Sequence, residues 1–532
     1  MGLNAKFIRS VCLLLFFGAA SYGATITGTV KGTEGAPFQG AFVEAQNTKS
    51  RITVIVLSDS HGQYQIEKLP AGEYRLQIRA AGFRTDPQTG VNLTADQKVS
   101  CDFALQKGVV RWNDISFYQA RQLWPAARGK DLLVAHCATC HLFQTRMASV
   151  TRDADGWRDR LQYMQTTMHV DVTDQDADVI ASYLTSLFGP ESVLPKSPAD
   201  MPAYNDTVRT FGSDALNIVY VEYDMPGPSR MPFSAAPDKN GYVWIPNFGV
   251  ANKITRLDPK TGEMQDFSVP NIGTAAIHSA VPAPDGSVWM TETDSNKLGR
   301  WDPNTRTITE YQDYYLPGKE GTIDGGSKHT VRIDPSGNAW ASGGPLTKFD
   351  PETGKFTHFE GVAFAYDVKP DKNGDVWFTQ SGANKIGKVD GKTMKVSQWA
   401  MPTPKSFPRR MEIAPDGMIW VGEFNAGKMA RFDTKTETFT EYPLPGPDPT
   451  PYSMGFDADG YLWYNSHDMD ELARFDTKTG KVIEYPVPHS EIAMRELFRD
   501  AQGRMWYGTN PNNKVGYFYL ANHSNGAESA SK

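Results

Sequence analysis

The spacing of hydrophobic residues changes twice along the first 214 residues of this 532-residue chain. Residues 24–107 contain short runs in which apolar and polar residues alternate, separated by Gly and Pro turns. Alternation with a period of two predicts strands with one buried face, so we expect a small antiparallel β-sandwich. In residues 108–190 the apolar period lengthens towards 3.6, which predicts a small all-α domain. Residues 191–214 are rich in Pro and polar residues and are predicted to form a linker.

From residue 215 the dominant pattern is a repeat. Each unit runs P-D-G-x-[VIL]-W, a polar loop, [NG]-K-[IVLM]-x-[RK]-[FWLV]-D, a K-T-G turn and E-Y-x-x-P, with variations. The unit tryptophans are separated by 45, 51, 37, 43, 43 and 43 residues. They are Trp244, Trp289, Trp340, Trp377, Trp420, Trp463 and Trp506. This period, with several short strands per unit, predicts a seven-bladed β-propeller over residues 215–521 whose tryptophans lie in the core.

The two ends of the repeat region predict how the ring closes. The last unit ends without an E-Y-x-x-P strand, while the strand-like run "NIVYVEYDMP" at 217–226 precedes the first unit. An open ring would expose two sheet edges. We therefore expect the early strand to complete the seventh blade.

Composition and the chain ends indicate an exported protein. The formal charge of -7 argues against a nucleic-acid partner. Residues 1–23 combine Lys6 and Arg9 with an apolar run and small residues before a cleavage point, as in a secretory signal peptide. No later run approaches the 18 or so apolar residues of a transmembrane segment. The mature protein is predicted to be periplasmic or secreted, with residues 522–532 as a disordered tail.

The cysteines predict a covalent haem. Signal cleavage leaves Cys101, Cys137 and Cys140, an odd number that does not suit a simple disulfide framework. Cys137, Cys140 and His141 form C-x-x-C-H, in which two thiols bind the haem vinyl groups and the histidine binds the iron. A zinc knuckle needs a second ligand pair and a thioredoxin-like pair a βαβ setting, and neither pattern occurs here. We predict one haem c.

The segments around this motif support the prediction by resemblance. "ARGKDLLVAHCATCH" resembles the N-terminal helix of small cytochromes c, and "DGWRDRLQYM" followed by "TDQDADVIASYLTSLFG" resembles their later helices. The family spacing from Trp157 implies Met164 as the sixth iron ligand, with Met168 and His169 as alternatives. A thioether ligand raises the reduction potential relative to two histidines.

The sandwich segment resembles the carboxypeptidase regulatory-like family. The resemblance is carried by "GAPFQGAFVEA", "DSHGQY" and "LPAGEYRLQIRAAGF". It implies a transthyretin-like sandwich with a structural or adhesive role and no catalysis.

The propeller units resemble the virginiamycin B lyase family through "PDGSVWMTETDSNKLGRWDP" and "PDKNGDVWFTQSGANKIGKVD". The namesake enzyme opens a cyclic depsipeptide by elimination, using His and Glu at the channel mouth with magnesium. His278 and Glu292 match those positions. The family's second histidine, two residues after the catalytic Glu, is Asp294 here, and Asn425 follows Glu423 at the same distance. This departure argues against the family's elimination chemistry.

Aligning the units predicts the residues at one mouth of the channel. The position six residues before the proline of P-D-G is occupied by Met231, His278, His329, Phe364, Arg409, Tyr452 and Arg495. The position three residues after each tryptophan includes Glu292 and Glu423. The predicted catalytic residues are His278, His329, Glu292, Glu423, Arg409 and Arg495.

These residues support more than one kind of site. A Glu beside a neutral His acts as a general base, and an arginine stabilises an anion or oxyanion. The same His and Glu side chains are also ligands for magnesium or another divalent cation.

The predicted fold is therefore mainly β and multidomain, with a β-sandwich, a small all-α cytochrome c domain and a seven-bladed propeller. The predicted function is periplasmic electron transfer by a monohaem cytochrome whose propeller binds a small-molecule substrate or a redox partner protein, as an oxidoreductase or dehydrogenase component. The alternatives are a metal-dependent lyase and a non-catalytic binding module.

Overall fold

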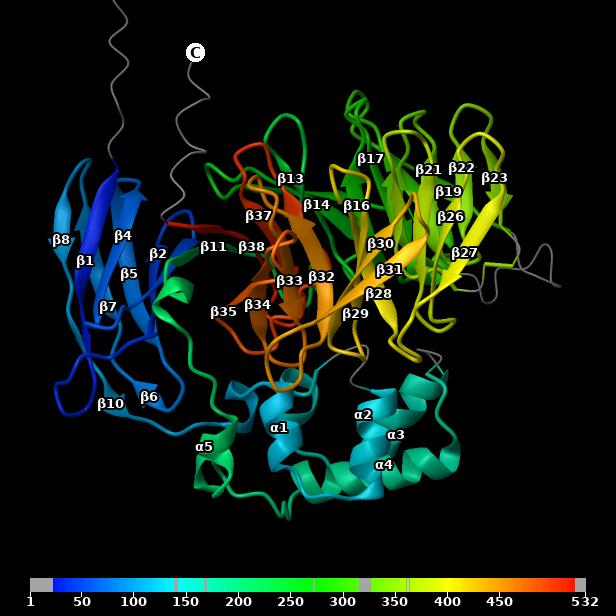
Figure 1. Cartoon of the computed structure of the whole chain (residues 1–532). Helices are drawn as coiled ribbons and strands as arrows, with labels where there is room; N and C mark the ends of the chain where they lie inside the picture. The colour runs from blue at the N-terminus through cyan, green and yellow to red at the C-terminus, as the bar shows by residue number, and fades with distance from the viewer. Residues whose placement is uncertain are drawn as a thin grey trace, which may run out of the picture.

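The computed structural model describes most of the chain, and the predicted signal peptide and C-terminal tail lie outside its described residues, apart from Gly23. The described residues are 23–137, 142–166, 170–270, 273–314, 327–359, 361–362 and 364–521. Three units are visible in Figure 1: an N-terminal sandwich, a helical segment, and a propeller whose lower face the helices cover. The architecture is mainly β, as predicted.

The N-terminal unit is a β-sandwich. One sheet has the order β4-β1-β8 with β9 also on β1, and the facing sheet contains β3-β2-β5-β7. Inward residues of both sheets, among them Ile26, Leu76 and Cys101, form one buried cluster. The strands are β1 (Ala24–Lys31), β2 (Phe42–Asn47), β3 (Ile52–Leu57), β4 (Gln63–Leu69), β5 (Gly72–Arg79), β6 (Phe83–Arg84), β7 (Gln88–Leu93), β8 (Lys98–Ser100), β9 (Phe103–Ala104) and β10 (Gln106–Lys107).

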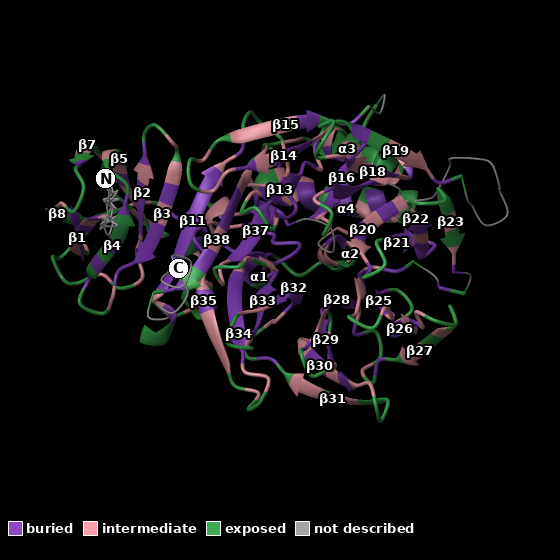
Figure 2. Cartoon of the chain, turned by 90° about the horizontal axis from the view of Figure 1, so that it is seen from above, coloured by how far each residue is buried: buried purple, intermediate pink, exposed green. Residues whose placement is uncertain are grey.

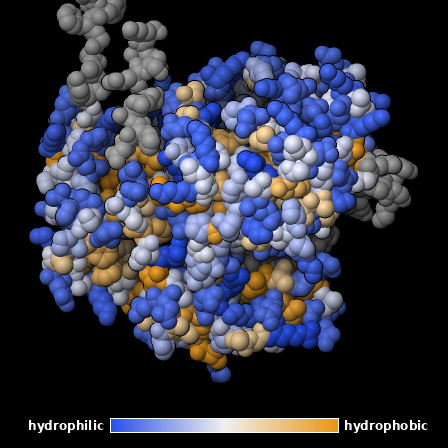
Figure 3. Space-filling model, viewed as in Figure 1, coloured by the Kyte–Doolittle hydropathy of each residue, from blue (hydrophilic) through white to orange (hydrophobic). Residues whose placement is uncertain are grey.

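The helical segment packs around an apolar core to which its helices contribute. Ser116 and Thr173 cap the N-termini of α1 and α4 with their side chains. Figure 3 shows hydrophobic residues in the lower half of the molecule, over this segment and its junction with the other units. The helices are η1 (Trp112–Asp114), α1 (Phe117–Leu123), α2 (Arg128–His136), η2 (Gln144–Ala148), α3 (Ala154–Thr166) and α4 (Asp174–Phe188).

The segment predicted as a linker, residues 191–214, is folded against its neighbours. It contains the short helices η3 (Pro198–Asp200), α5 (Tyr204–Thr207) and η4 (Ser213–Ala215). The indole N–H of Trp112 donates to the Pro195 carbonyl at 2.8 Å, and Arg209 forms an ion pair with Glu471 of the propeller at 3.0 Å. The helical segment and the propeller are therefore joined by a packed strap.

Helices α2 and α4 touch at Gly129, which gives a test of the helical packing. A β-carbon at this position would lie 2.8 Å from Cγ of Tyr183 and 3.1 Å from the Val179 carbonyl oxygen. We expect Gly129→Ala to lower the free energy of unfolding of this segment by about 1–3 kcal/mol, because the helices must move apart. Helical circular dichroism during denaturation measures the effect. Gln162→Ala, at an exposed site on α3, should leave the transition in place, and equal stability of both variants would contradict this packing.

The propeller contains seven blades in the described part of the chain. Its strands are β11 (Ile218–Asp224), β12 (Ala236–Pro237), β13 (Val243–Pro246), β14 (Lys253–Leu257), β15 (Met264–Ser268), β16 (Ile277–Pro282), β17 (Val288–Glu292), β18 (Lys297–Trp301), β19 (Ile308–Gln312), β20 (Ser327–Ile333), β21 (Ala339–Gly344), β22 (Thr347–Asp350), β23 (Lys355–His358), β24 (Val368–Pro370), β25 (Val376–Gln380), β26 (Lys385–Val389), β27 (Val396–Ala400), β28 (Pro408–Ile413), β29 (Ile419–Glu423), β30 (Lys428–Asp433), β31 (Thr438–Pro443), β32 (Pro451–Phe456), β33 (Leu462–Ser466), β34 (Glu471–Phe475), β35 (Val482–Pro486), β36 (Phe498–Arg499), β37 (Met505–Thr509) and β38 (Lys514–Leu520). A short helix, η5 (Thr293–Ser295), follows β17.

The repeat tryptophans are core residues, as predicted. All seven are buried on the second strand of their blades. In four blades the indole N–H donates to the aspartate of the preceding hairpin, for example from Trp506 to Asp500 at 2.7 Å. The conformation of the P-D-G type turn is thus tied to the blade core by one hydrogen bond.

The predicted ring closure is confirmed, and it involves the sandwich as well. β11 pairs with β38 along its whole length, from Ile218 opposite Leu520 to Asp224 opposite Lys514. The other edge of β11 pairs with β3 of the sandwich, so blade seven and one sandwich sheet form a single sheet of eight strands. Pairing covers both edges of the closing strand. Among the described residues, no helix is long and apolar enough to cross a membrane.

Candidate functional site at the propeller mouth

One residue from each blade forms a ring at the mouth that faces the helical segment. In the view from above, the blades surround a centre with α1 and α2 behind it (Figure 2). Each ring residue stands at or just before the innermost strand of its blade, eleven positions before the blade tryptophan. The mouth ring is Phe233, His278, His329, Tyr366, Arg409, Tyr452 and Arg495.

Two histidines form one side of the ring. The imidazoles of His278 and His329 lie with their ring centroids 3.8 Å apart. Phe233 contacts the first ring edge-on at 4.8 Å, and Tyr366 contacts the second at 4.5 Å. Nδ1 of His278 is buried and has no hydrogen-bond partner among the described residues.

Two tyrosines and two arginines form the other side. The hydroxyls of Tyr366 and Tyr452 are hydrogen-bonded to each other, and Arg409 donates to the Tyr366 hydroxyl at 3.2 Å. The Arg409 guanidinium lies 4.5 Å from the ring centroid of Tyr452, and that of Arg495 lies 4.8 Å from it. Cations over aromatic faces are attracted by the ring quadrupole.

The ring differs from the predicted column in two blades. Phe233 and Tyr366 occupy it where Met231 and Phe364 were expected. Blades one and four carry "PDKNG" where other units have a turn shorter by two residues, so counting from the proline misplaces these two positions. Phe364 lies further out, 46% exposed and 6.1 Å from the His329 ring. Counting from the tryptophan would have found both residues.

A second layer of polar residues lies directly beneath the ring. Arg410 donates to the Thr330 hydroxyl at 2.8 Å and to the Asp367 carboxylate at 3.0 Å. It also forms an ion pair with Glu496 at 3.1 Å, and Arg332 pairs with the same carboxylate at 2.6 Å. This layer joins the innermost segments of four blades and carries both signs of charge.

Burial and the neighbouring arginines set the protonation states of the ring. Burial lowers the pKa of His278 and the charges of Arg410 and Arg495 lower it further, while burial and His278 lower the pKa of His329. Burial by itself raises the pKa of Tyr452. The charges of Arg495, Arg409 and Arg410 outweigh this and lower the pKa of the phenol to about 8. Both imidazoles are therefore neutral at neutral pH, and Tyr452 ionises unusually early.

The acidity of Tyr452 gives a direct measurement. We expect one tyrosine of the folded protein to ionise at about pH 8, ahead of ordinary tyrosines at about 10. The ultraviolet absorbance of phenolate during a pH titration reports this step. Tyr452→Phe should remove it, whereas Tyr314→Phe, at a residue that is 62% exposed, should not. A wild-type titration with no step below the ordinary range would refute the described electrostatics.

The two predicted glutamates lie away from the mouth ring, each towards the outer strands of its own blade. Glu292 at the end of β17 approaches Ser295 at 3.3 Å, and burial together with Glu310 raises its pKa to about 8. Glu423 at the end of β29 neighbours Glu441 of the outer strand, and burial raises its pKa to about 7. Of the six predicted catalytic residues, the structure gathers His278, His329, Arg409 and Arg495 in one ring.

The helical segment covers this mouth through residues that follow the C-x-x-C-H motif. The side chain of Gln144 donates to Asp470 at 3.1 Å, and the backbone N–H of Thr145 donates to Glu491 at 2.7 Å. Arg146 approaches Sδ of Met231 at 3.9 Å, and its pKa is lowered by burial, with the charge of Arg495 contributing. The chain directly after the motif therefore lies on the propeller mouth.

Of the C-x-x-C-H motif, the structure describes only the first residue, Cys137. Cys137 is the C-cap of α2, half-buried and packed on the helical core. Cys140 and His141 lie outside the described residues. So do Met168 and His169, the alternative iron ligands. Met164, the predicted ligand, is half-buried near the end of α3.

The helical segment contains donors suited to an anionic group. Nε1 of Trp157 and Nη1 of Arg152 are both buried without an acceptor among the described residues, and the guanidinium lies 5.0 Å from the indole ring centroid. Buried donors are nearly always satisfied. Haem propionates are acceptors of the kind that these two donors would satisfy.

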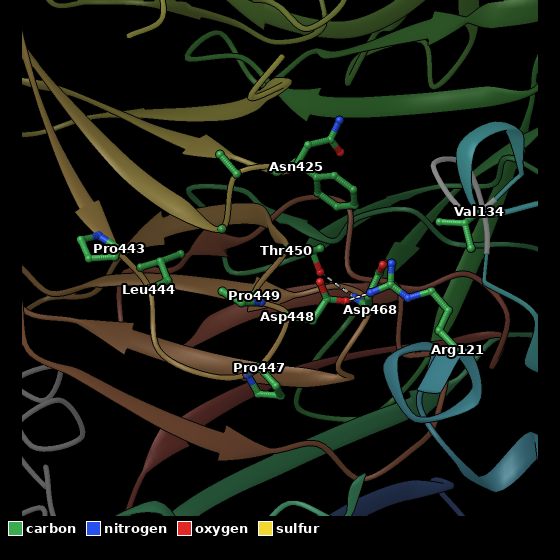
Figure 4. A pocket seen from close by; sticks show the side chains of 13 residues that line it. Arg121, Val134, Asn425, Pro443, Leu444, Pro447, Asp448, Pro449, Thr450 and Asp468 are labelled. Carbon is green, nitrogen blue, oxygen red and sulfur yellow. Dashed lines mark hydrogen bonds and ion pairs between the residues drawn. The ribbon is translucent and has the colours of Figure 1, made fainter. Parts of the chain in front are cut away.

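A chamber of 470 Å³ lies beside the mouth, between the helical segment and blades five and six. Arg121 of α1 and Val134 of α2 form its helical wall, facing Asn425, Leu444 and the prolines of the propeller loops (Figure 4). Phe424 lines the chamber and lies 4.2 Å from the Arg409 guanidinium. The chamber thus extends from the motif helix to the mouth ring.

A metal site was also predicted for the mouth. Within the described ranges, no three His, Cys, Asp or Glu side chains come together as a metal-binding group. His278 and His329 supply two adjacent imidazoles there.

Comparison with known proteins defines two of the three units. The model of the carboxypeptidase regulatory-like domain matches residues 25–106, and that of the virginiamycin B lyase family matches residues 344–525. The second match includes Arg409, Glu423 and Arg495, whereas His278, Glu292 and His329 precede it. No curated protein matches the chain.

Solved structures share the propeller fold. A streptogramin B lyase is 21% identical, with coverage of 58% of this chain and 100% of that one and a TM-score of 0.52. A selenomethionine-substituted virginiamycin B lyase from Staphylococcus aureus is also 21% identical, with coverage of 57% and 99% and a TM-score of 0.51. At this identity the likeness shows the fold alone.

The fold and the site define a multidomain propeller protein with a polar mouth that is covered by helices. More particularly, the chain carries a carboxypeptidase regulatory-like domain followed by a virginiamycin B lyase-like propeller.

Proposed function

We propose that this protein is an exported monohaem redox protein whose propeller mouth binds a substrate or a redox partner. Cys137, Cys140 and His141 would hold one covalent haem, with Met164 as the sixth ligand. The observation that carries the proposal is the position of the residues that flank the motif. Val134, three residues before the motif, lines the chamber beside the mouth. Gln144, three residues after the motif, contacts the propeller.

When bound, the haem supplies one-electron chemistry through its iron. The chain's own residues supply the surroundings. Neutral His278 is a proton acceptor, the acidic Tyr452 is a proton donor, and Arg409 and Arg495 favour negative charge at the mouth. Helices α1 and η2 contact the propeller loops around this cluster and cover it.

The reduction potential tests whether the haem lies at the mouth. A nearby positive charge favours the reduced state, so Arg495→Gln is expected to lower the potential. Arg84→Gln changes an exposed arginine of the sandwich and should leave the potential unchanged. Redox titration of the holoproteins measures both. Equal reduction potentials in the wild type and Arg495→Gln would show that the haem does not lie near the propeller mouth. That result would overturn the proposed arrangement.

A metal-dependent lyase is the second candidate, and the neutral imidazoles of His278 and His329 favour it as general bases. Elimination assays on a streptogramin B substrate, with and without magnesium, discriminate the two functions. Magnesium-dependent turnover that is lost in His278→Ala and indifferent to the haem redox state would establish the lyase. No turnover under any of these conditions is expected from the redox function.

A further inference from the structure

The chamber beside the mouth contains a buried carboxylate whose hydrogen bonding is incomplete. Asp468 is 5% exposed and lines the chamber, and its Oδ1 has no partner within the described residues. Its backbone is held on both sides. Its N–H donates to the Thr450 hydroxyl at 2.8 Å, and its carbonyl accepts from the N–H of Tyr118 at 2.8 Å. The free acceptor therefore has a fixed position at the chamber wall.

The charges around this carboxylate are balanced. Arg121 and Asp448 form an ion pair across the chamber. Burial raises the pKa of Asp468 to about 6, and the charges of Arg121 and Arg409 oppose that rise, so the group is ionised at neutral pH. Arg121, Asp448 and Asp468 line the chamber, and the Arg409 guanidinium behind the Phe424 ring adds the second positive charge. An added cation would be repelled by Arg121 and Arg409, and an added anion by Asp448 and Asp468.

Most of the remaining lining residues are apolar, although Asn425 and Thr450 also line the chamber. Val134, Leu444 and Phe424 line the chamber together with Pro443, Pro447 and Pro449. Its volume of 470 Å³ lies within the range of about 300–1,000 Å³ found for small-ligand sites. Such walls suit a compact hydrocarbon body.

We propose that the chamber binds a small neutral alcohol, with the hydroxyl donating to Oδ1 of Asp468 and the hydrocarbon body against Phe424 and the proline wall. The unpartnered acceptor requires a donor, the balanced charges favour a neutral one, and the apolar residues of the wall favour a nonpolar body. This inference deepens the proposed function by naming a substrate class for it. Because alcohol binding involves no redox step, an experiment can refute the alcohol site without refuting the redox function, and the reverse.

Three probes that share the same hydrocarbon body test the inference. Their affinities for the holoprotein are measured by calorimetry. They are cyclohexanol, cyclohexylammonium and cyclohexanecarboxylate. We expect the alcohol to bind at least about tenfold more tightly than either ion, because each ion faces a like charge. Tighter binding of either ion, or no binding of the alcohol, would overturn the proposal.

Two variants locate the binding site. Asp468→Asn should weaken cyclohexanol binding by about tenfold, because a hydrogen bond to a carboxylate is about twice as strong as one to an amide. Ala426→Phe places a ring in the chamber from a half-exposed position and should abolish binding even if the first variant fails to fold. Lys435→Ala, in an exposed turn, is the matched control and should bind like the wild type.

The haem spectrum distinguishes the ligand site from the cofactor site. If the alcohol site is separate, Ala426→Phe abolishes alcohol binding while the Soret band keeps its position. A shifted Soret band in that variant would show that the haem itself occupies the chamber, which would overturn the proposal. Alcohol binding by a preparation that carries no haem would support the site while refuting the proposed redox function.

Discussion

Cys137→Ser combined with Cys140→Ser is expected to yield protein without covalently attached haem. In the proposed site both thioether bonds of the c-type haem are made by these two thiols, so the double variant would retain no anchoring sulfur in the motif. Absorbance of the denatured protein after acid-acetone extraction measures what remains attached. The expected change is from one haem per chain to none.

The sandwich provides a matched control for this variant. Cys101 is a buried free thiol on the inner face of the sandwich, and burial raises its pKa. Cys101→Ser should therefore retain the full haem content. Equal haem contents in the double variant and in Cys101→Ser would show that the motif does not attach the cofactor.

The second large effect is expected at Arg410, beneath the mouth ring. Its guanidinium contacts the carboxylates of Asp367 and Glu496, which are 0% and 3% exposed. Removing one partner of a buried ion pair leaves an uncompensated charge, which costs about 3–5 kcal/mol. We expect Arg410→Ala to lower the free energy of unfolding of the propeller by this amount, measured by denaturant titration.

An arginine outside the ring controls for loss of charge alone. Arg84 is exposed on β6, and Arg84→Ala should change the free energy of unfolding by less than about 0.5 kcal/mol. If Arg410→Ala unfolds at the same denaturant concentration as the wild type, the layer does not support the inner strands as described.

Much of the propeller could be predicted because its signals are local and repeated. The tryptophan spacing marks the blades, and the incomplete last unit marks the closing strand. The placement of His278, His329, Arg409 and Arg495 in one ring follows from the same periodicity. Phe233 and Tyr366 were missed because a longer turn in their blades displaced the proline used for alignment, although the tryptophan register was unchanged.

Other features depend on contacts between distant segments. The pairing of β3 with β11 joins two units into one sheet, and the alternation within each strand is compatible with many partners. The contact of Thr145 with Glu491 and the chamber lined by Asp468 depend in the same way on how the helical segment lies against the propeller. Glu292 and Glu423 were grouped with the ring because the pattern gives position along a strand and not radial direction.

The central claim is that the motif beside the propeller mouth carries one covalent haem. The most direct measurement is the absorbance of the purified, reduced wild-type protein before and after acid-acetone extraction. The account predicts a c-type α-band that stays with the protein after extraction, at one haem per chain. A haem that extracts freely, or a protein expressed with haem-attachment machinery that shows no α-band, would contradict it.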